Sequence, residues 1–168
     1  KIGIGNRLLL QDAFNLESMS GLVRFVKKVI KGTFLVEFIG ALGYMTVFIP
    51  QFGLRGIWVS IFNSISAFCN AGIDIIAEDS LSQYATNPVI NFITCALIVL
   101  GGIGYIVWWD VIRVLSHSKR KWPHRLKDLS LHSKIAISAT FFFILSGAVA
   151  TFVFEYNNPL TIKDLSIF

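Results

Sequence analysis

The sequence predicts an all-α membrane protein, and three observations lead to that fold class. Hydrophobic residues make up 54% of the 168 residues and charged residues only 15%, against about 25% charged residues in ordinary soluble domains. The mean hydropathy is +0.66. Three apolar runs, at residues 33–52, 89–110 and 135–154, come close to the roughly 20 residues that a helix needs to cross the hydrocarbon core. This composition argues against a soluble enzyme, a disordered tail and a disulfide scaffold.

Residues 1–32 form a basic segment ahead of the first predicted span. Apolar and basic side chains recur within it at helical spacing, which predicts an amphipathic helix. We interpret the segment as a cytosolic linker whose helix lies on the membrane surface, with a docking surface for a cytosolic partner as the alternative. The chain begins abruptly and without Met, so we expect it to be a fragment of a longer protein. The basic face of the helix comprises Arg24, Lys27, Lys28 and Lys31.

The distribution of positive charge predicts the orientation of the spans. Of the 15 Lys and Arg residues, six lie in residues 1–31 and seven in residues 113–134. Because two crossings separate these blocks, both lie on one side, and the positive-inside rule assigns that side to the cytoplasm. We therefore expect a multi-pass protein of the bacterial plasma membrane, with a cytoplasmic N-terminal segment and a cytosolic loop at 113–134. The positive charge then faces lipid head groups or a protein partner, and no nucleic-acid partner is expected.

The external connection between the first two spans is too apolar for an exposed loop. Residues 57–68 carry large apolar side chains at helical spacing, which predicts a short helix. Twelve residues make a helix of about 18 Å, too short to cross the membrane. We interpret residues 57–68 as a pore helix that enters the membrane from outside and returns. The apolar positions are Trp58, Ile61, Phe62, Ile65 and Phe68.

The segment after this helix, residues 69–73, is the candidate ion filter. It is rich in small residues, and non-helical backbone at membrane depth is tolerated only inside protein or beside a water-filled path. Backbone carbonyls that face such a path can replace the water shell of K⁺. The predicted K⁺ ligands are the main-chain carbonyls of Cys69, Asn70, Ala71 and Gly72. Acidic residues just outside would raise the local cation concentration, and these are Asp74, Glu78 and Asp79.

The alternative is a membrane scaffold or interaction protein without an ion path. In that case residues 57–68 form a cap helix on the membrane surface, and Gly72 is an ordinary helix-ending glycine. A substitution of Gly72 separates the two hypotheses, because a cap tolerates it and a filter does not. Enzyme activity is not expected, since the sequence contains no nucleophile–base pair, phosphate-binding loop or cluster of metal ligands.

Small and charged residues near the end of the second span carry two further expectations. Gly101, Gly102 and Gly104 lie within it, and we expect them to pack closely against neighbouring helices, with a hinge as the alternative. Asp110 and Arg113 are three residues apart and are expected to pair.

At this point the sequence resembles a known family, the Trk/Ktr/HKT potassium transporters, with the membrane subunit of bacterial Ktr systems the nearest match. The residues 62–74, which read FNSISAFCNAGID, resemble the second pore segment of that family. Residues 1–15, 101–110 and 131–134 resemble its first linker, the end of its second repeat and the entry to its third. The resemblance covers nearly the whole chain.

The resemblance implies four membrane–pore–membrane repeats around one axis. This chain would supply the second repeat, at residues 33–112, and the first helix and external segment of the third, at 135–168. Gly72 matches the filter glycine, whereas Ile73 stands where Phe is common. Tyr105-Ile106 stands where Phe-Pro is common, so we expect a less kinked helix there.

The resemblance implies that the chain is part of the ion-translocating subunit of a potassium uptake transporter. Both sodium-dependent and sodium-independent transport are compatible with it. The implied partners are the remaining repeats of the same polypeptide, a second copy of the membrane subunit, and the lipid bilayer. A cytosolic regulatory ring is also implied, and it would bind the regulatory nucleotide, ATP or ADP. No cofactor is implied for this chain itself.

Overall fold

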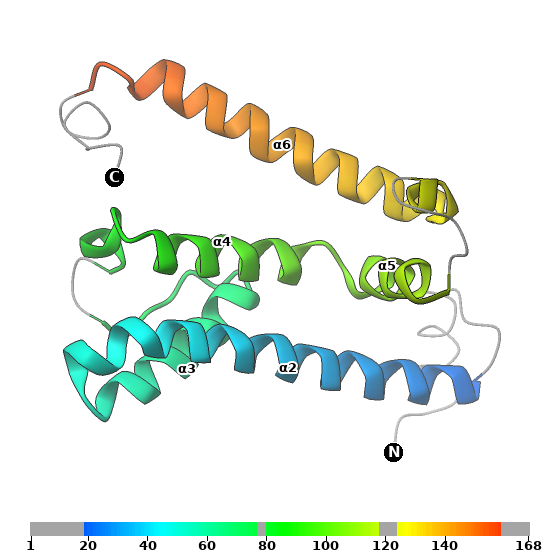
Figure 1. Cartoon of the computed structure of the whole chain (residues 1–168), viewed down its shortest axis with the longest axis horizontal. Helices are drawn as coiled ribbons and strands as arrows, with labels where there is room; N and C mark the ends of the chain where they lie inside the picture. The colour runs from blue at the N-terminus through cyan, green and yellow to red at the C-terminus, as the bar shows by residue number, and fades with distance from the viewer. Residues whose placement is uncertain (1–18, 77–79, 118–123, 159–168) are drawn as a thin grey trace.

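The structure, a computed structural model, describes residues 19–76, 80–117 and 124–158. Its elements in order are α2 (Met19–Phe52), α3 (Arg55–Phe68), η1 (Ser82–Tyr84), α4 (Pro88–Gly102), α5 (Tyr105–His117), η2 (His124–Asp128) and α6 (Leu131–Glu155). In this described part every regular element is a helix (Figure 1). The segments Val23–Phe52 and Leu131–Glu155 are long and apolar enough to cross a membrane, and α4 with α5 adds a third if the bent pair is one span. The predicted all-α membrane fold class is confirmed.

Helix α2 is longer than we expected. We predicted a surface helix before residue 32 and a separate span over residues 33–52, but one helix of 34 residues continues through both. That prediction of a boundary is wrong because the junction offers only Gly32 to break the helix, and one glycine costs a helix only about 1 kcal/mol. A side chain at Gly32 would meet the ring of Trp108 at an ordinary van der Waals distance of 3.5 Å. The basic segment and the first span are therefore parts of one rod.

A tight turn folds α3 back along α2. Gly53 has a positive φ of 59°, and its N–H donates to the carbonyl of Ile49 over 2.8 Å, which is a common way to end a helix. Gly56, at the start of α3, lies so close to the backbone of Phe48 that any side chain there would overlap it. Glycine at both positions allows α2 and α3 to pack with their backbones nearly touching.

The core lies where α2, α3 and α4 meet. Tyr44 and Phe48 of α2 are fully buried and their rings stack 5.6 Å apart. Val59 of α3 and Ile90 and Leu97 of α4 complete this cluster. Asn87 caps α4 by accepting hydrogen bonds from the N–H groups of the first turn. These contacts make α2, α3 and α4 one packed unit.

The second span is not the continuous helix that we predicted over residues 89–110. It breaks after Ile103, and α4 and α5 are bent by 100°. Gly104 takes a φ of 91°, a conformation that favours glycine, and the indole N–H of Trp108 donates to the carbonyl of Leu100 over 2.9 Å. The expectation of a less kinked helix is therefore also wrong: a glycine with an indole donor produces a sharp bend without proline.

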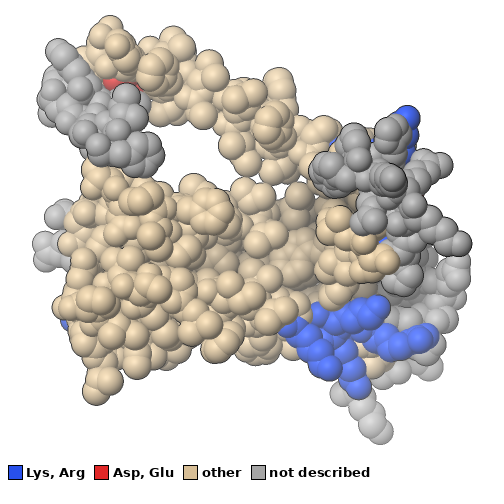
Figure 2. Space-filling view, viewed as in Figure 1, with Lys and Arg blue, Asp and Glu red and all other residues tan. Residues whose placement is uncertain are grey.

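Helix α6 stands apart from the packed unit. Its side chains are exposed along nearly its whole length, and its buried residue is Ser133 near the start. Figure 2 shows open space between the middle of α6 and the rest of the molecule. Its first turn contacts α5 and is capped by Ser130. An apolar helix with this much exposed surface requires lipid or further protein around it.

Candidate functional site

The candidate filter segment follows directly from the end of α3. The N–H groups of Cys69, Asn70 and Ala71 donate back to carbonyls of the last turn of α3, over 2.9–3.1 Å. Asn70 and Gly72 both have positive φ, at 55° and 67°. Beyond this point the backbone leaves the helix and stays irregular as far as Ile76. The four predicted ligand residues thus lie in one short turn at the carboxyl end of a short helix.

The carbonyls of this turn are unoccupied by hydrogen bonds within the described residues. No hydrogen bond reaches the carbonyl oxygens of Cys69, Asn70, Ala71 or Gly72 from that part of the chain, and all four residues are exposed. Backbone oxygens need a hydrogen-bond partner or a cation once they are removed from water, so these four carbonyls are free to take water, another segment or a cation. The carboxyl end of α3 adds the partial negative charge of a helix terminus to the same place.

Ser66 joins the far end of the segment to α3, and the sequence reasoning missed it. Its hydroxyl accepts from the N–H of Ile73 over 3.0 Å and also donates to the carbonyl of Ile73. Ser66 is 8% exposed, so its hydroxyl acts inside the protein. One side chain therefore fixes both backbone groups of the residue that closes the segment.

The sequence could have pointed to Ser66, because polar residues recur along one face of this otherwise apolar helix. Helix α3 buries Ser60, Asn63, Ser64 and Ser66, while Trp58 is 62% exposed. This arrangement is the reverse of a helix on a water-soluble protein. A surface cap helix would turn its polar face to water, whereas α3 turns that face into the packed unit.

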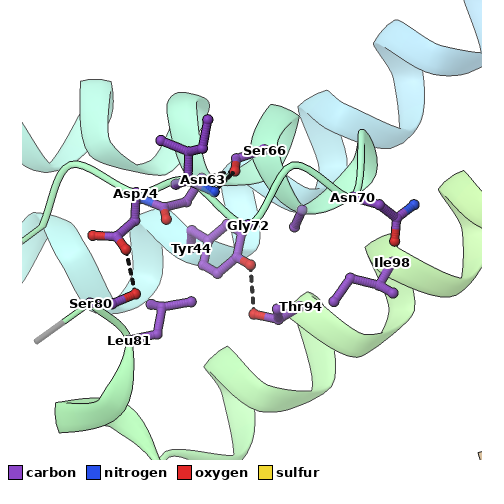
Figure 3. Close-up of a pocket in the computed structure, with 12 residues that line it drawn as sticks. Tyr44, Asn63, Ser66, Asn70, Gly72, Asp74, Ser80, Leu81, Thr94 and Ile98 are labelled. Carbon is purple, nitrogen blue, oxygen red and sulfur yellow. Dashed lines mark hydrogen bonds between the residues drawn. The ribbon is translucent and has the colours of Figure 1, made fainter.

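A cavity of about 170 Å³ lies behind the segment, bounded by α2, α3 and α4. Figure 3 shows Tyr44 and Thr94 joined across it, with their hydroxyl oxygens 2.6 Å apart. Ser66, Asn63 and Gly72 line other parts of its wall. The segment therefore rests on a partly polar support formed by α2, α3 and α4.

The acidic residues expected outside the segment are only partly described. Asp74 is half-buried, and its carboxylate accepts hydrogen bonds from the N–H of Ile76, over 3.1 Å, and from the hydroxyl of Ser80 (Figure 3). Both carboxylate oxygens thus hold the loop in place. Glu78 and Asp79 lie outside the described residues.

The three glycines at the end of α4 divide into two roles. A side chain at Gly101 would overlap the carbonyl oxygen of Phe68, the last residue of α3, and Gly102 faces the side-chain amide of Asn70. Gly104, two residues beyond α4, has no neighbour within 4 Å in the described part of the chain and forms the bend, which agrees with the hinge given as the alternative. Gly101 lets α4 approach the base of the candidate filter segment.

Helix α5 contains the ion pair that was expected from the sequence. Asp110 and Arg113 form an ion pair, as predicted. Asp110 is 9% exposed, and its second oxygen accepts from the N–H of Ser130 over 2.8 Å. This carboxylate therefore ties α5 to the start of α6.

These features define the class as a multi-pass membrane protein, in which a short helix and an irregular loop are inserted between membrane helices. A family model described as "cation transport protein", TrkH, matches residues 10–168. The chain therefore belongs to the TrkH family, as the sequence resemblance indicated, and the expectation that it is not an enzyme is confirmed by this membership.

Curated relatives agree with the family assignment. The chain is 38% identical over 164 residues to the potassium/sodium uptake protein NtpJ of Enterococcus hirae, covering 97% of this chain and 34% of the relative. It is 33% identical over 168 residues to the Ktr system potassium uptake protein B of Bacillus subtilis, covering 99% of this chain and 36% of that protein. The protein of the same description from Vibrio alginolyticus is 30% identical over 167 residues, with 99% and 35% covered. The chain thus spans about a third of the length of these relatives.

Proposed function

We propose that this chain is part of the ion-translocating subunit of a potassium uptake transporter, and that its filter segment contributes backbone carbonyls to the cation path. The proposed ligands are the carbonyl oxygens of Cys69, Asn70, Ala71 and Gly72. The observation that carries the proposal is that these four carbonyls are exposed and accept no hydrogen bond from the described residues. Oxygens in this state can replace the water shell of a potassium ion.

The surroundings of the segment support a cation over other ligands. The carboxyl end of α3 carries partial negative charge, and the carboxylate of Asp74 lines the same cavity as Asn70 and Gly72. One segment supplies ligands from one side only, so a complete cage requires others. We propose that residues 33–112 form one of several similar repeats around the ion path and that residues from 135 begin the next repeat.

Potassium as the transported ion rests on the family and on the names of the relatives, which include potassium and potassium/sodium uptake proteins. We propose a location in the bacterial plasma membrane with the basic ends of α2 and α5 in the cytoplasm, because positive charge favours that side. Sodium coupling, a second membrane subunit and a nucleotide-binding regulatory ring complete the proposal.

The filter proposal is tested by Gly72→Ser in the intact transporter, with Gly53→Ser as a matched control. Both glycines have a positive φ, 67° and 59°, and both face open space. Each substitution therefore imposes a similar backbone strain of about 1–2 kcal/mol. Only Gly72 lies in the proposed ion path.

The measurements are rubidium uptake and potassium-limited growth in cells that lack their own potassium transporters. We expect Gly72→Ser to lower the preference for potassium over sodium about tenfold or more, because a misdirected carbonyl costs at least about 1.4 kcal/mol in ion selectivity. Gly53→Ser should keep that preference at similar membrane abundance. Equal selectivity in both variants would refute the filter role.

A further inference from the structure

The first two exposed turns of α2 carry a continuous row of positive charge. Four basic side chains occur at spacings of three, one and three residues, which places them along one side of the helix. All four are exposed, and Figure 2 shows the resulting blue patch over the N-terminal part of α2. We call this row the basic stripe, and it consists of Arg24, Lys27, Lys28 and Lys31.

The position of the basic stripe along α2 matches the level of phospholipid head groups. Helix α2 has 34 residues and is about 51 Å long, whereas the hydrocarbon core is about 30 Å thick. From Gly32 to its end at Phe52 the helix carries one charged residue, Glu37. The opposite end of the helix must therefore emerge from the hydrocarbon, and the stripe lies in the turns that do so.

Two tryptophans of α5 mark the same level independently. The ammonium group of Lys28 lies 5.6 Å from the centre of the Trp109 ring, and a side chain at Gly32 would meet the rings of both Trp108 and Trp109 at 3.5–3.8 Å. Both tryptophans are half-buried, and tryptophan rings are enriched where membrane meets water. The stripe and the indole rings thus form one surface of basic and aromatic groups.

Within the described part of the chain, no acidic side chain neutralises this surface. The ion pair of the described residues joins Asp110 to Arg113, and none of the four stripe residues takes part in one. Four exposed cations next to a membrane-crossing segment attract anionic lipid.

We infer that the basic stripe, with Trp109 beside it, binds the phosphate-bearing head groups of anionic phospholipids. Lipid is favoured over an acidic soluble protein because the stripe belongs to the membrane-crossing helix itself and lies level with the tryptophans. The inference concerns the membrane face of α2 and α5 and does not depend on the filter proposal.

The test measures lipid binding next to Trp109 in the intact transporter, reconstituted in phosphatidylcholine vesicles. Dibrominated phosphatidylglycerol or dibrominated phosphatidylcholine is added, and each quenches tryptophan fluorescence on contact. The contribution of Trp109 is the difference between the protein and its Trp109→Phe variant. We expect phosphatidylglycerol to be preferred by about tenfold at this site, and the preference to fall with added salt.

Two variants of the stripe separate charge from structure. R24Q/K27Q/K28Q/K31Q removes all four charges. It should bring the ratio of phosphatidylglycerol binding to phosphatidylcholine binding close to one. R24K/K27R/K28R/K31R keeps the charges and should keep the preference. Quenching by dibrominated phosphatidylcholine, together with the elution volume in detergent, reports whether each variant is folded.

The inference is overturned if the Gln variant is folded and still prefers phosphatidylglycerol, or if the unmodified protein shows no preference. It is also overturned, in favour of a protein partner, if the Gln variant keeps its lipid preference and loses binding of a purified soluble subunit of the same uptake system.

Discussion

The packed unit of α2, α3 and α4 and the isolated helix α6 are both apolar, yet they differ in how they meet their surroundings. The packed unit buries Tyr44, Phe48 and Leu97 in its core and brings its backbones together. Helix α6 is more hydrophobic than α2, with a hydropathy of 2.1 against 1.6 over the best window, yet it buries only Ser133. Hydrophobicity therefore places a helix in the membrane but does not decide which helices pack together.

Small residues at the contacts account for the difference. Gly40, Gly43 and Gly101 lie where a neighbouring side chain or backbone approaches closely. Gly147 of α6 has nothing near it in this structure. In lipid the hydrophobic effect gives no reason for one apolar helix to prefer another, so close backbone approach decides the pairing.

The largest effect is expected for Gly101→Ala, compared with Gly147→Ala. A methyl group at Gly101 would overlap the carbonyl oxygen of Phe68, so α4 must move away from α3. We expect a loss of about 3 kcal/mol in stability, measured as the fraction of intact transporter that stays folded after heating in detergent. Gly147→Ala should change this by less than about 1 kcal/mol. Equal losses would show that α6 packs tightly against segments outside this chain.

The sequence was sufficient to predict the fold class, the family and the position of the short helix. The fold class and the short helix depend on average hydropathy and on side-chain period, which any helix in lipid must display, whereas the family was indicated by the resemblance of residues 62–74 to its second pore segment. The bend at Gly104 was not predictable in this way. Three glycines within four residues look the same in the sequence whether they pack against a helix or break one. In the structure Gly104 has a positive φ, whereas Gly101 lies against the backbone of Phe68.

Ser66 was missed for a related reason. The prediction of a helix over residues 57–68 rested on its apolar side chains and gave the serines no role. In the structure those serines form the buried face, because a helix surrounded by apolar material gains from turning its hydroxyl groups inward. The four predicted filter residues remain a prediction, since their role depends on segments that lie outside this chain.

The second-largest loss of stability is expected at Asp110, which ties helix α5, after the packed unit, to the start of α6. Asp110 holds the N–H of Ser130 at the start of α6 and pairs with Arg113. Asp110→Ala should cost about 2 kcal/mol, because it removes hydrogen bonds to a nearly buried carboxylate, and this loss is measured by the same heating assay. Arg113 is 61% exposed, so Arg113→Gln should cost less than about 1 kcal/mol. Neither should alter ion selectivity, and a changed selectivity would mean that α6 is coupled to the ion path.

The third prediction tests the support of the filter segment within the packed unit. Ser66→Ala leaves the N–H of Ile73 without its partner and should cost about 1–2 kcal/mol. Its control is Ser60→Ala, because Ser60 is also buried and donates within α3, to the carbonyl of Gly56 over 2.7 Å. We expect Ser66→Ala alone to weaken the preference for rubidium over sodium several-fold in uptake measurements. A similar change in both variants would assign the effect to α3 in general.

The smallest effect is expected where α2 and α4 meet through one hydrogen bond between side chains. The hydroxyl oxygens of Tyr44 and Thr94 lie 2.6 Å apart in a part of the unit where Tyr44 is fully buried. Tyr44→Phe and Thr94→Val should each cost about 1 kcal/mol. The double variant should cost less than the sum by about 0.5–1 kcal/mol, because either substitution alone already breaks the bond. If the two losses in stability are strictly additive in the heating assay, each hydroxyl has its hydrogen bond elsewhere. Thr94 already donates to the carbonyl of Ile90 over 2.8 Å. Packing around glycine would then hold α2 to α4 without the bond between Tyr44 and Thr94.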